Sequence, residues 1–485
     1  MHRLLTAVAL LLALAAPART YVYGVTGGGP TISPASTSPG LQPGDTLLVG
    51  GTYYQLNFRG LQGTVDKLIY VVCLPSQLVT SSAAYTAGEW SDCAFVKLVA
   101  FRSVNNLAPV HWIRARCHDL TFDGCTYLND RGRYSDKQVW LFDDKYSTAM
   151  TFDGTKATTF YNVTIVNCRV SGFRETNVLE LGSEGKRSVC TDFTVERCSF
   201  RNLTSYAALI PGVLGGTVFN LGFRYNRVDS VLADAGAYQR VHASALTGYG
   251  NGEVAYNVFE TMYANPVRWN PLTWAGLPGY AGPLLVHDNL VHGLLSYDAF
   301  ELNNNNSGPR IAALGCDTAA TDVYHNTVVR TTRMSYNGDY HGYVVGLLAH
   351  KVRVRYNVIV DPEHGTTYDP AGRLGYAVAF ISGDQPGFDS AGNRCFPTAA
   401  AAGLDTAGWQ LTALSPLVDA VDVSPSTQDL DGVARPQGLR KDRGALERPA
   451  AVPPSRRLLS VVTTTDAGQL VVTLLWSDGT SSVYR

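Results

Sequence analysis

Residues 330–341 hold the densest group of side chains suited to acid–base chemistry: two Arg, two Tyr, an Asp and a His within twelve residues. Elimination beside a carboxylate needs a cation to neutralise that carboxylate, a base to remove a proton and an acid for the leaving oxygen. The residues that we expect in these roles are Arg333 or Arg268 as the cation, His341 as the base, and Tyr336 or Tyr340 as the acid. A solvated polar loop is the alternative interpretation of the same stretch.

Carboxylates nearby offer hydrolysis as a second chemistry. Hydrolysis of a glycosidic bond uses two carboxylates about 5–10 Å apart. Glu301 with either Asp298 or Asp339 is the candidate pair. Asn303, which begins a run of four Asn, is a candidate binding residue, although the run equally fits a structural row of Asn side chains.

The stretch from Thr261 to Pro283 is rich in aromatic residues and looks like a long insertion. Aromatic faces stack on sugar rings, and an Arg can hold a carboxylate through two parallel hydrogen bonds. The candidate binding residues here are Tyr263, Arg268, Trp269 and Trp274. The alternative is a loop that packs against its own aromatic side chains.

An internal repeat must position these residues. The pattern is apolar, variable, apolar, two variable residues, Cys or Asn, variable, apolar, as in VTIVNCRV (163–170) and VRVRYNVI (352–359). It recurs at intervals of about 33 residues, which is the mark of a solenoid. Its Cys or Asn falls at Cys125, Cys168, Cys198, Asn226, Asn257, Asn289, Asn326, Asn357 and Asn393.

Each repeat alternates apolar and polar residues, as a strand with one buried face does. Stacking such strands about 4.8 Å apart makes one continuous core. Asn tolerates left-handed dihedral angles and can bond to the backbone of its neighbours. We therefore predict an all-β fold, a right-handed parallel β-helix of about eleven coils. A β-sandwich or propeller would need paired hairpin signals, which the sequence lacks.

A second strand falls between successive repeats, and it would build a long exposed sheet. Alternation places Leu179, Leu181, Phe300 and Leu302 inward, and Glu180, Glu301 and Asn303 toward solvent. Glu180 and Glu301 would lie about 19 Å apart, too far for one acid–base pair. The predicted strands are residues 178–183, 207–212, 243–248, 299–304, 344–349 and 377–382.

Two segments resemble secreted parallel β-helix proteins of the pectate-lyase-like superfamily. The opening segment, residues 43–72, contains PGDTLLVGGTYY, and the exit segment, residues 415–447, contains a Ser-Pro-x-x-Asp-Ala start, a DLDG turn and a final Gly-Ala-x-Glu. The resemblance implies this fold, export from the cell, and binding of acidic or neutral glycans along the exposed long sheet. Members include polysaccharide lyases, hydrolases, epimerases and phage tailspikes.

The catalytic patterns of that superfamily do not transfer to this chain. Asp361-Pro362-Glu363-His364 has the residue types of the epimerase motif in the wrong order. The predicted strands 207–212 and 243–248 lack the Lys and Arg of one lyase group, and clustered Asp residues typical of pectin hydrolases are missing.

The amino-terminal residues have the layout of a secretory signal peptide. His2 and Arg3 precede an apolar run at 4–16, and Ala16-Pro17-Ala18 suits cleavage near Ala18. We expect an extracellular or cell-surface location without a transmembrane segment. A net charge of −1 gives no reason to expect nucleic acid as a partner, so a polysaccharide or surface glycan is the expected one.

Export permits disulfides, and the chain has nine Cys. Cys73 with Cys93 is the favoured pair, since both precede the repeats. No Cys or His spacing suits zinc, so no metal site is predicted, and a Ca²⁺ requirement is left open.

These observations divide the chain into a signal peptide (1–18), the β-helix with its amino-terminal cap (19–447), a Pro-rich linker (448–457) and a β-hairpin module (458–485). The expected function is that of a secreted glycan-active protein, a polysaccharide lyase or hydrolase. The alternative is a non-catalytic surface or adhesion protein that binds carbohydrate. Oligomeric state is not predicted.

Overall fold

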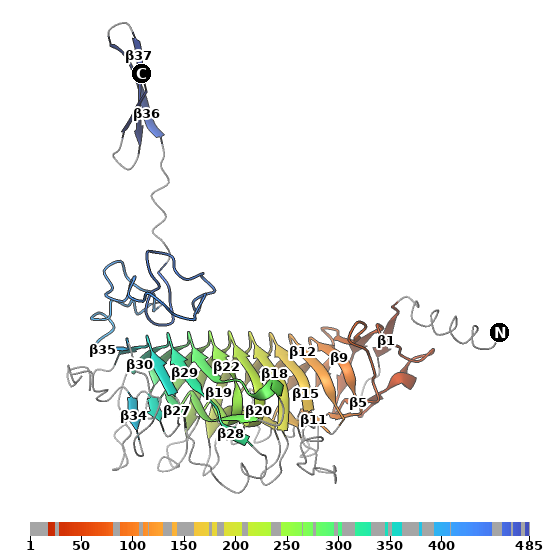
Figure 1. Ribbon diagram of the computed structural model, residues 1–485. Helices are drawn as coiled ribbons and strands as arrows, with labels where there is room; N and C mark the ends of the chain where they lie inside the picture. Colours follow the sequence, from red (N-terminus) through yellow and green to blue (C-terminus); the bar gives the residue numbers. More distant parts are fainter. Residues whose placement is uncertain are drawn as a thin grey trace, which may run out of the picture.

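Figure 1 shows the computed structural model, in which almost every described element is a β-strand. The structure describes residues 18–24, 29–80, 88–105, 110–114, 116–129, 138–142, 160–173, 177–181, 189–205, 212–233, 244–263, 265–274, 278–294, 299–302, 316–330, 345–347, 352–360, 378–380, 392–407, 409–448, 458–466, 469–476 and 481–484.

The parallel strands line three sides of the coiled chain, here called sheets I, II and III, and each complete coil contributes one strand to each; sheets I and II are joined into one through strands that they share. Sheet I holds the strands that precede the Cys or Asn positions: β1 (Thr20–Gly24), β3 (Thr46–Gly50), β6 (Ile69–Cys73), β9 (Ala94–Val99), β12 (His118–Asp123), β15 (Phe160–Val166), β18 (Val189–Glu196), β20 (Gly212–Arg224), β22 (Leu246–Ala255), β25 (Leu284–His287), β29 (Thr321–Tyr324) and β32 (Val352–Arg355). 

Sheet II is the long sheet that the second strand of each repeat was expected to form. The strands β20 and β22 are long enough to pass from sheet II into sheet I, so they belong to both. The other members are β2 (Thr31–Ile32), β5 (Asn57–Arg59), β8 (Glu89–Ser91), β11 (His111–Ile113), β14 (Trp140–Phe142), β17 (Asn177–Leu181), β24 (Val267–Trp274), β27 (Phe300–Leu302), β31 (Val345–Leu347) and β34 (Val378–Phe380).

Sheet III has 12 strands among the described residues, and from β13 onward each of them follows a Cys or Asn turn. It comprises β4 (Thr52–Tyr53), β7 (Leu78–Val79), β10 (Arg102–Val104), β13 (Thr126–Leu128), β16 (Arg169–Ser171), β19 (Ser199–Ser205), β21 (Arg227–Ala233), β23 (Val258–Met262), β26 (Leu290–Leu294), β30 (Thr327–Arg330), β33 (Val358–Val360) and β35 (Arg394–Phe396). The predicted parallel β-helix is therefore confirmed, and eleven complete coils lie within the described residues, in agreement with the expected number of about eleven.

The predicted ladder is present between sheets I and III. From Asn257 to Asn393, each ladder Asn accepts two hydrogen bonds at its Oδ1 from the Asn before it, at 2.9–3.1 Å. Asn226 accepts one such bond, because the residue before it in the ladder is Cys198. Its Nδ2 also donates to a backbone carbonyl of the preceding coil, such as Phe223 for Asn257 at 2.8 Å. Cys198 bridges the two kinds of rung, because its backbone N donates to Asn226 Oδ1 at 2.9 Å. This edge is thus hydrogen bonded from coil to coil.

One detail of the ladder differs from expectation. The left-handed residue of each turn is the one before the ladder position, as at Tyr256 (φ 58°) and His325 (φ 52°), and not the Asn itself. A left-handed conformation is strained for a bulky side chain. The Asn is selected for its hydrogen bonds, while its predecessor makes the turn.

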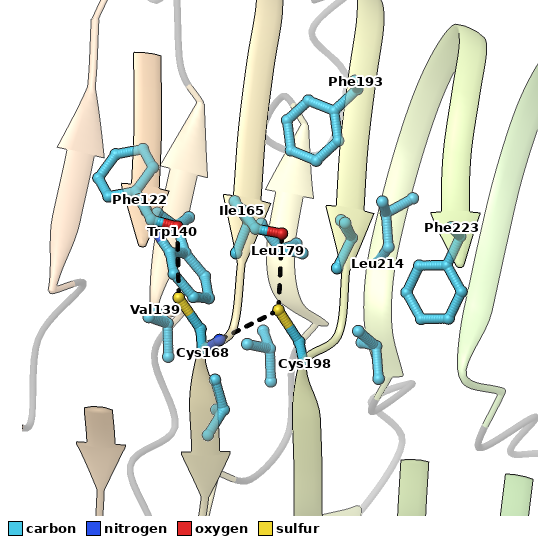
Figure 2. Packing of buried hydrophobic residues seen from close by; sticks show 14 of the residues in the cluster. Phe122, Val139, Trp140, Ile165, Cys168, Leu179, Phe193, Cys198, Leu214 and Phe223 are labelled. Carbon is cyan, nitrogen blue, oxygen red and sulfur yellow. Dashed lines mark hydrogen bonds between the residues drawn. The ribbon is translucent and has the colours of Figure 1, made fainter. Parts of the chain in front are cut away.

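The core is a continuous stack of apolar side chains enclosed by the three sheets. Figure 2 shows the Cys part of the ladder, where Phe122 and Ile165 are in register on successive coils and Val195 and Phe223 continue the row. The thiols of Cys168 and Cys198 donate to the backbone carbonyls of Phe122 and Ile165, each at 3.5 Å. Leu179, Leu181, Phe300 and Leu302 point inward as predicted, with at most 4% exposure.

The prediction of sheet II was wrong in its middle. The supposed insertion from Thr261 contributes the regular strand β24. Of the strand expected at 207–212, only Gly212, the first described residue of β20, lies within the described residues. The apolar alternation of Val267, Trp269 and Pro271 belongs to β24, so its aromatic residues fill the core. Trp269 is 0% exposed and donates from Nε1 to the carbonyl of Gly250 at 3.2 Å.

The predicted Cys73–Cys93 disulfide is wrong, because the register of β6 and β9 keeps the two residues far apart. Cys73 ends β6, whereas Cys93 precedes the start of β9, and Val72 pairs with Val99. At about 3.3 Å per residue, this register puts the two Cys about 20 Å apart. The pair was predicted only because both Cys precede the repeats in the sequence, and this position says nothing about their distance in space.

Residues 409–448, here called the closing segment, lie along the ladder edge of the later coils (Figure 1). Leu430, Ala445 and Leu446 pack against Tyr256 and Leu290. Ala445 N donates to Thr327 Oγ1 at 2.9 Å, and Gly444 N donates to the carbonyl of Tyr356.

Beyond the closing segment, residues 458–484 contain three antiparallel strands. These are β36 (Leu458–Asp466), β37 (Gln469–Trp476) and β38 (Ser481–Tyr484). The remaining elements are β28 (Cys316–Thr318), antiparallel to β24, and the short 3-10 helices η1 (Pro34–Ser36) and η2 (Pro278–Tyr280). No helix in the described part of the chain is long and apolar enough to cross a membrane.

Candidate functional site

The outward face of sheet II presents one residue per coil in strict register. Glu180 of β17 is followed by Gly215, Thr247, Arg268 and Glu301 on the next four strands. We call these five residues the outward row. Glu180 and Glu301 face outward as predicted, and the four steps between them confirm the separation of about 19 Å.

An ion pair closes one end of the outward row. Arg268 Nε lies 3.2 Å from Glu301 Oε1, with 29% of the Arg268 side chain and 14% of the Glu301 side chain exposed. The other guanidinium nitrogens of Arg268 have no hydrogen-bond partner among the described residues. Arg268 therefore keeps donors for a ligand while Glu301 fixes the direction of its guanidinium group.

The middle of the outward row contains polar atoms that the described protein does not satisfy. Thr247 Oγ1 and, beside it, Asn177 Oδ1 are buried without a hydrogen-bond partner in the described part of the chain. The Asn177 amide lies across Gly215, where an added Cβ would come within 2.0 Å of Asn177 Nδ2. A buried polar atom without a partner costs about 1–3 kcal/mol, so these two atoms mark a place where a ligand can form hydrogen bonds.

The structure brings together only some of the predicted site residues. Arg268 and Glu301 are in contact, which sequence analysis did not foresee because Arg268 was assigned to an insertion. Trp269, Trp274 and Tyr263 are buried, with at most 3% exposure, so they are core residues and not sugar-binding ones. The remaining predicted site residues lie outside the described residues: Asp298, Asn303, Arg333, Tyr336, Asp339, Tyr340 and His341.

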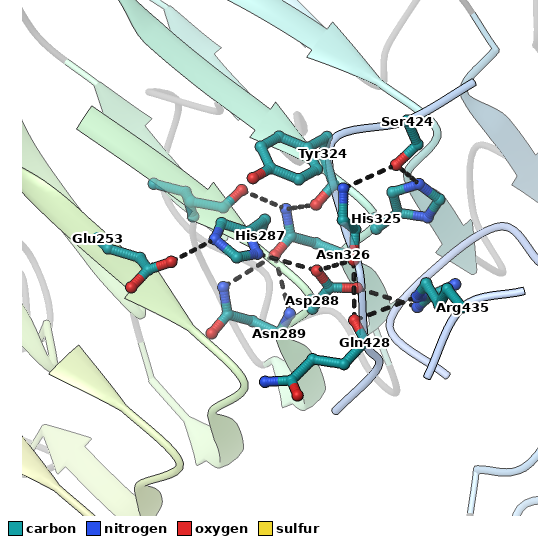
Figure 3. Close-up of polar contacts among 12 residues, drawn as sticks. Glu253, His287, Asp288, Asn289, Tyr324, His325, Asn326, Ser424, Gln428 and Arg435 are labelled. Atoms are coloured by element: carbon teal, nitrogen blue, oxygen red, sulfur yellow. Dashed lines mark hydrogen bonds and ion pairs between the residues drawn. The ribbon is translucent and has the colours of Figure 1, made fainter. Parts of the chain in front are cut away.

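A second polar cluster joins the ladder edge to the closing segment (Figure 3). His287 bridges two carboxylates at 2.9 Å each, Glu253 through Nε2 and Asp288 through Nδ1. Asp288 in turn accepts from Arg435 Nη2 at 2.9 Å, and Arg435 Nη1 donates to Glu447 Oε2 at 2.9 Å. Negative and positive groups therefore alternate along this chain of contacts.

Burial and charge set the protonation of this cluster. Burial alone would lower the pKa of His287, but its hydrogen bonds to Asp288 and Glu253 raise that pKa above the usual value. The hydrogen bond from His287 lowers the pKa of Glu253 despite partial burial. The side chains of Asp288, Arg435 and Glu447 are wholly buried and paired with one another, so the cluster anchors the closing segment and is closed to substrate.

Sequence analysis also missed a second ladder, on the outer face of sheet I. Asp119, Asn162, Asp192 and Asn220 occupy matched bulges on successive coils, with φ between 51° and 58°. Asn162 donates to Asp119, and Asn220 donates to Asp192 at 2.6 Å. A signal was available, because an Asp or Asn directly precedes each of these repeats. Among the described residues, no group of three or more His, Cys, Asp or Glu could hold a metal ion.

Comparisons with known proteins found no matching family model and no matching curated protein. Similar solved structures include a GH136 lacto-N-biosidase from Eubacterium ramulus, at TM-score 0.38 and 10% identity over 78% of this chain and 68% of that one. The PL6 family alginate lyase AlyGC gives TM-score 0.35 and 12% identity over 77% of this chain and 51% of that one. The pectate lyase Pel9A gives 0.35 and 13% identity over 90% and 98%. At such TM-scores and identities, these structures bear on neither the reaction nor the substrate of this chain.

Proposed function

We propose that this chain is a glycan-active β-helix protein that binds a uronate-containing polysaccharide along the outward face of sheet II. The observation that carries the proposal is Arg268, which lies in register between Thr247 and Glu301 on that face. A guanidinium group held by a neighbouring carboxylate is pre-oriented, and it can bind a second carboxylate through its remaining N–H groups.

The neighbours of Arg268 suit the rest of a sugar ring. Thr247 Oγ1, on the adjacent strand, and Asn177 Oδ1, beside Gly215 one strand further on, have no partner among the described residues and can bond to hydroxyl groups. Asn270, two residues along β24, donates from Nδ2 to the carbonyl of Gly248 at 3.3 Å. Carboxylate, hydroxyl and amide groups therefore lie beside or near one cation.

β-Elimination is the reaction that this arrangement favours over hydrolysis. Arg268 would neutralise the uronate carboxylate, which acidifies the proton that a base must remove. Glu180 and Glu301 of the outward row are about 19 Å apart, beyond the 5–10 Å that a hydrolytic pair requires, and the predicted partners of Glu301, Asp298 and Asp339, lie outside the described residues. The predicted base His341, the predicted acids Tyr336 and Tyr340, and the second cation Arg333 complete the proposed mechanism, and secretion is part of the same proposal.

A non-catalytic carbohydrate-binding surface protein is the second candidate. The small residues Gly215 and Thr247 in the outward row favour it, since they make that part of the face a shallow platform. In that case Arg268 would bind the same acidic glycan without turnover.

A screen of the purified protein on acidic and neutral polysaccharides tests both candidates. Ultraviolet absorbance of unsaturated uronates reports elimination, reducing ends without that absorbance report hydrolysis, and binding without either product supports the non-catalytic protein. Arg268→Ala should abolish binding or turnover. Arg353→Ala is the matched control. Arg353 forms an ion pair with Asp322 of the neighbouring coil, as Arg268 does with Glu301, but this pair lies on sheet I and not on the proposed glycan-binding face. Equal effects of both variants, or a preference for neutral polymers, would refute the proposal.

A further inference from the structure

Cys93 and Cys117 occupy matched positions on neighbouring coils. Each directly precedes a strand of sheet I, β9 and β12, and the first residues of these strands, Ala94 and His118, are paired in parallel register. His118 N donates to the carbonyl of Cys93 at 3.1 Å, which fixes that register at the Cys residues. Neighbouring strands lie about 4.8 Å apart, within the 4.4–6.8 Å that a disulfide requires between Cα atoms.

The two thiols also face each other inside the protein. Both residues are 0% exposed. A hydrogen bond between the thiols, together with burial, raises the pKa of Cys117 well above its usual value. The Cys93 thiol also donates a hydrogen bond to the carbonyl of Ser91 at 3.4 Å.

The other thiols of the core are less suited to a bridge. Cys168 and Cys198 act as ladder rungs, because each donates to a backbone carbonyl and Cys198 Sγ accepts from Cys168 N at 3.3 Å. A bridge would remove these rung contacts. Cys190 stands in register with Phe160 and Val218, so it faces no thiol across the sheet.

We propose that Cys93 and Cys117 form a disulfide when the chain folds in an oxidising compartment, and that this bridge staples two successive coils near the amino-terminal end. The oxidant is a small-molecule disulfide such as oxidised glutathione. One Cys thiolate attacks it and releases one glutathione, leaving a mixed disulfide. The thiolate of the second Cys then displaces the second glutathione, so two protein thiols are oxidised and one glutathione disulfide is reduced. The exchange occurs during folding, since both thiols are buried afterwards.

Thiol counting tests the bridge directly. The full chain is refolded with reduced and oxidised glutathione, then unfolded in guanidinium without reductant and titrated. We expect seven thiols out of the nine in the sequence, and one linked peptide that contains Cys93 and Cys117 and separates on reduction. Nine thiols, or a linked peptide between other Cys residues, would overturn the proposal.

Variants separate a bridge from a packing role. Reduction should lower the guanidinium midpoint of the natural chain and of Cys190→Ser, the control for loss of a buried thiol. It should leave the midpoint of Cys93→Ser unchanged, because that variant has no bridge to reduce. If Cys93→Ser does not fold, the linked peptide in the natural chain and in Cys190→Ser still decides the matter. An equal response of Cys93→Ser and the natural chain would contradict the proposal.

Discussion

The ladder edge and the outward row of sheet II are built alike, with one residue per coil in parallel register, but they differ in how their polar atoms are satisfied. In the ladder, Asn257 Oδ1 accepts two hydrogen bonds and Nδ2 donates to Phe223 O and to Asn289 Oδ1. In the outward row, Thr247 Oγ1 is buried without a partner among the described residues. A fully satisfied row holds coils together, whereas an incompletely satisfied one can accept a ligand.

The ladder edge differs also in what covers it. The left-handed residues Asp288 and His325 are contacted by Ser426 and Ser424 of the closing segment, at 2.8 Å and 2.6 Å. The closing segment therefore contacts the ladder edge at residues whose backbone is in the strained left-handed conformation. We expect substitutions at this edge to change stability, and substitutions in the outward row to change function.

The largest expected effect is that of Arg435→Met. This change leaves the buried carboxylates of Asp288 and Glu447 without their cation, at a cost of about 3–5 kcal/mol. Guanidinium unfolding measures the loss, and proteolysis should show early cleavage within 409–448. A loss below about 1 kcal/mol would mean that the closing segment is not anchored by this cluster.

Within the ladder, Asn257→Ala should destabilise the protein more than Cys168→Ala. Loss of the Asn removes the acceptor of two buried donors of Asn226, for a cost of about 3 kcal/mol, while loss of the thiol removes weaker bonds and costs about 1–2 kcal/mol. Paired unfolding curves of the two variants measure the difference. Equal losses would show that the Asn and Cys parts of the ladder contribute alike.

A smaller effect, dependent on pH, is expected of His287→Gln. Because the folded pKa of His287 is raised, its contribution to stability is complete below the unfolded pKa of about 6.5 and is lost as pH rises through the folded pKa. The difference in unfolding free energy between the natural chain and His287→Gln should therefore be larger at pH 6 than at pH 9. Burial lowers the pKa of His325, so His325→Gln should show the opposite trend. A difference independent of pH would rule out a charged His287.

The repeat pattern was sufficient to predict the fold, because apolar alternation and the Cys or Asn position recur at nine successive turns from Cys125 to Asn393. Sheet II was harder to predict, since the connections around its strands vary in length and carry no shared motif. Trp269 and Trp274 were read as loop residues because aromatic content does not distinguish a core strand from a binding loop. The contact of Arg268 with Glu301 depends on register between strands 33 residues apart, which no local pattern encodes. Asp288 and Arg435 are 147 residues apart in the sequence, and no repeating pattern in the sequence predicts their contact.

The smallest expected effect on stability is that of Arg268→Ala, and this variant tests the central claim most directly. Its ion pair with Glu301 is partly exposed, so the loss should stay below about 1 kcal/mol. The measurement is binding of uronate-containing polysaccharide to the natural chain, Arg268→Ala and the control Arg353→Ala, each at a concentration where all three are folded. We predict that Arg268→Ala alone loses binding. Undiminished binding by Arg268→Ala would contradict the assignment of the outward row as the glycan site.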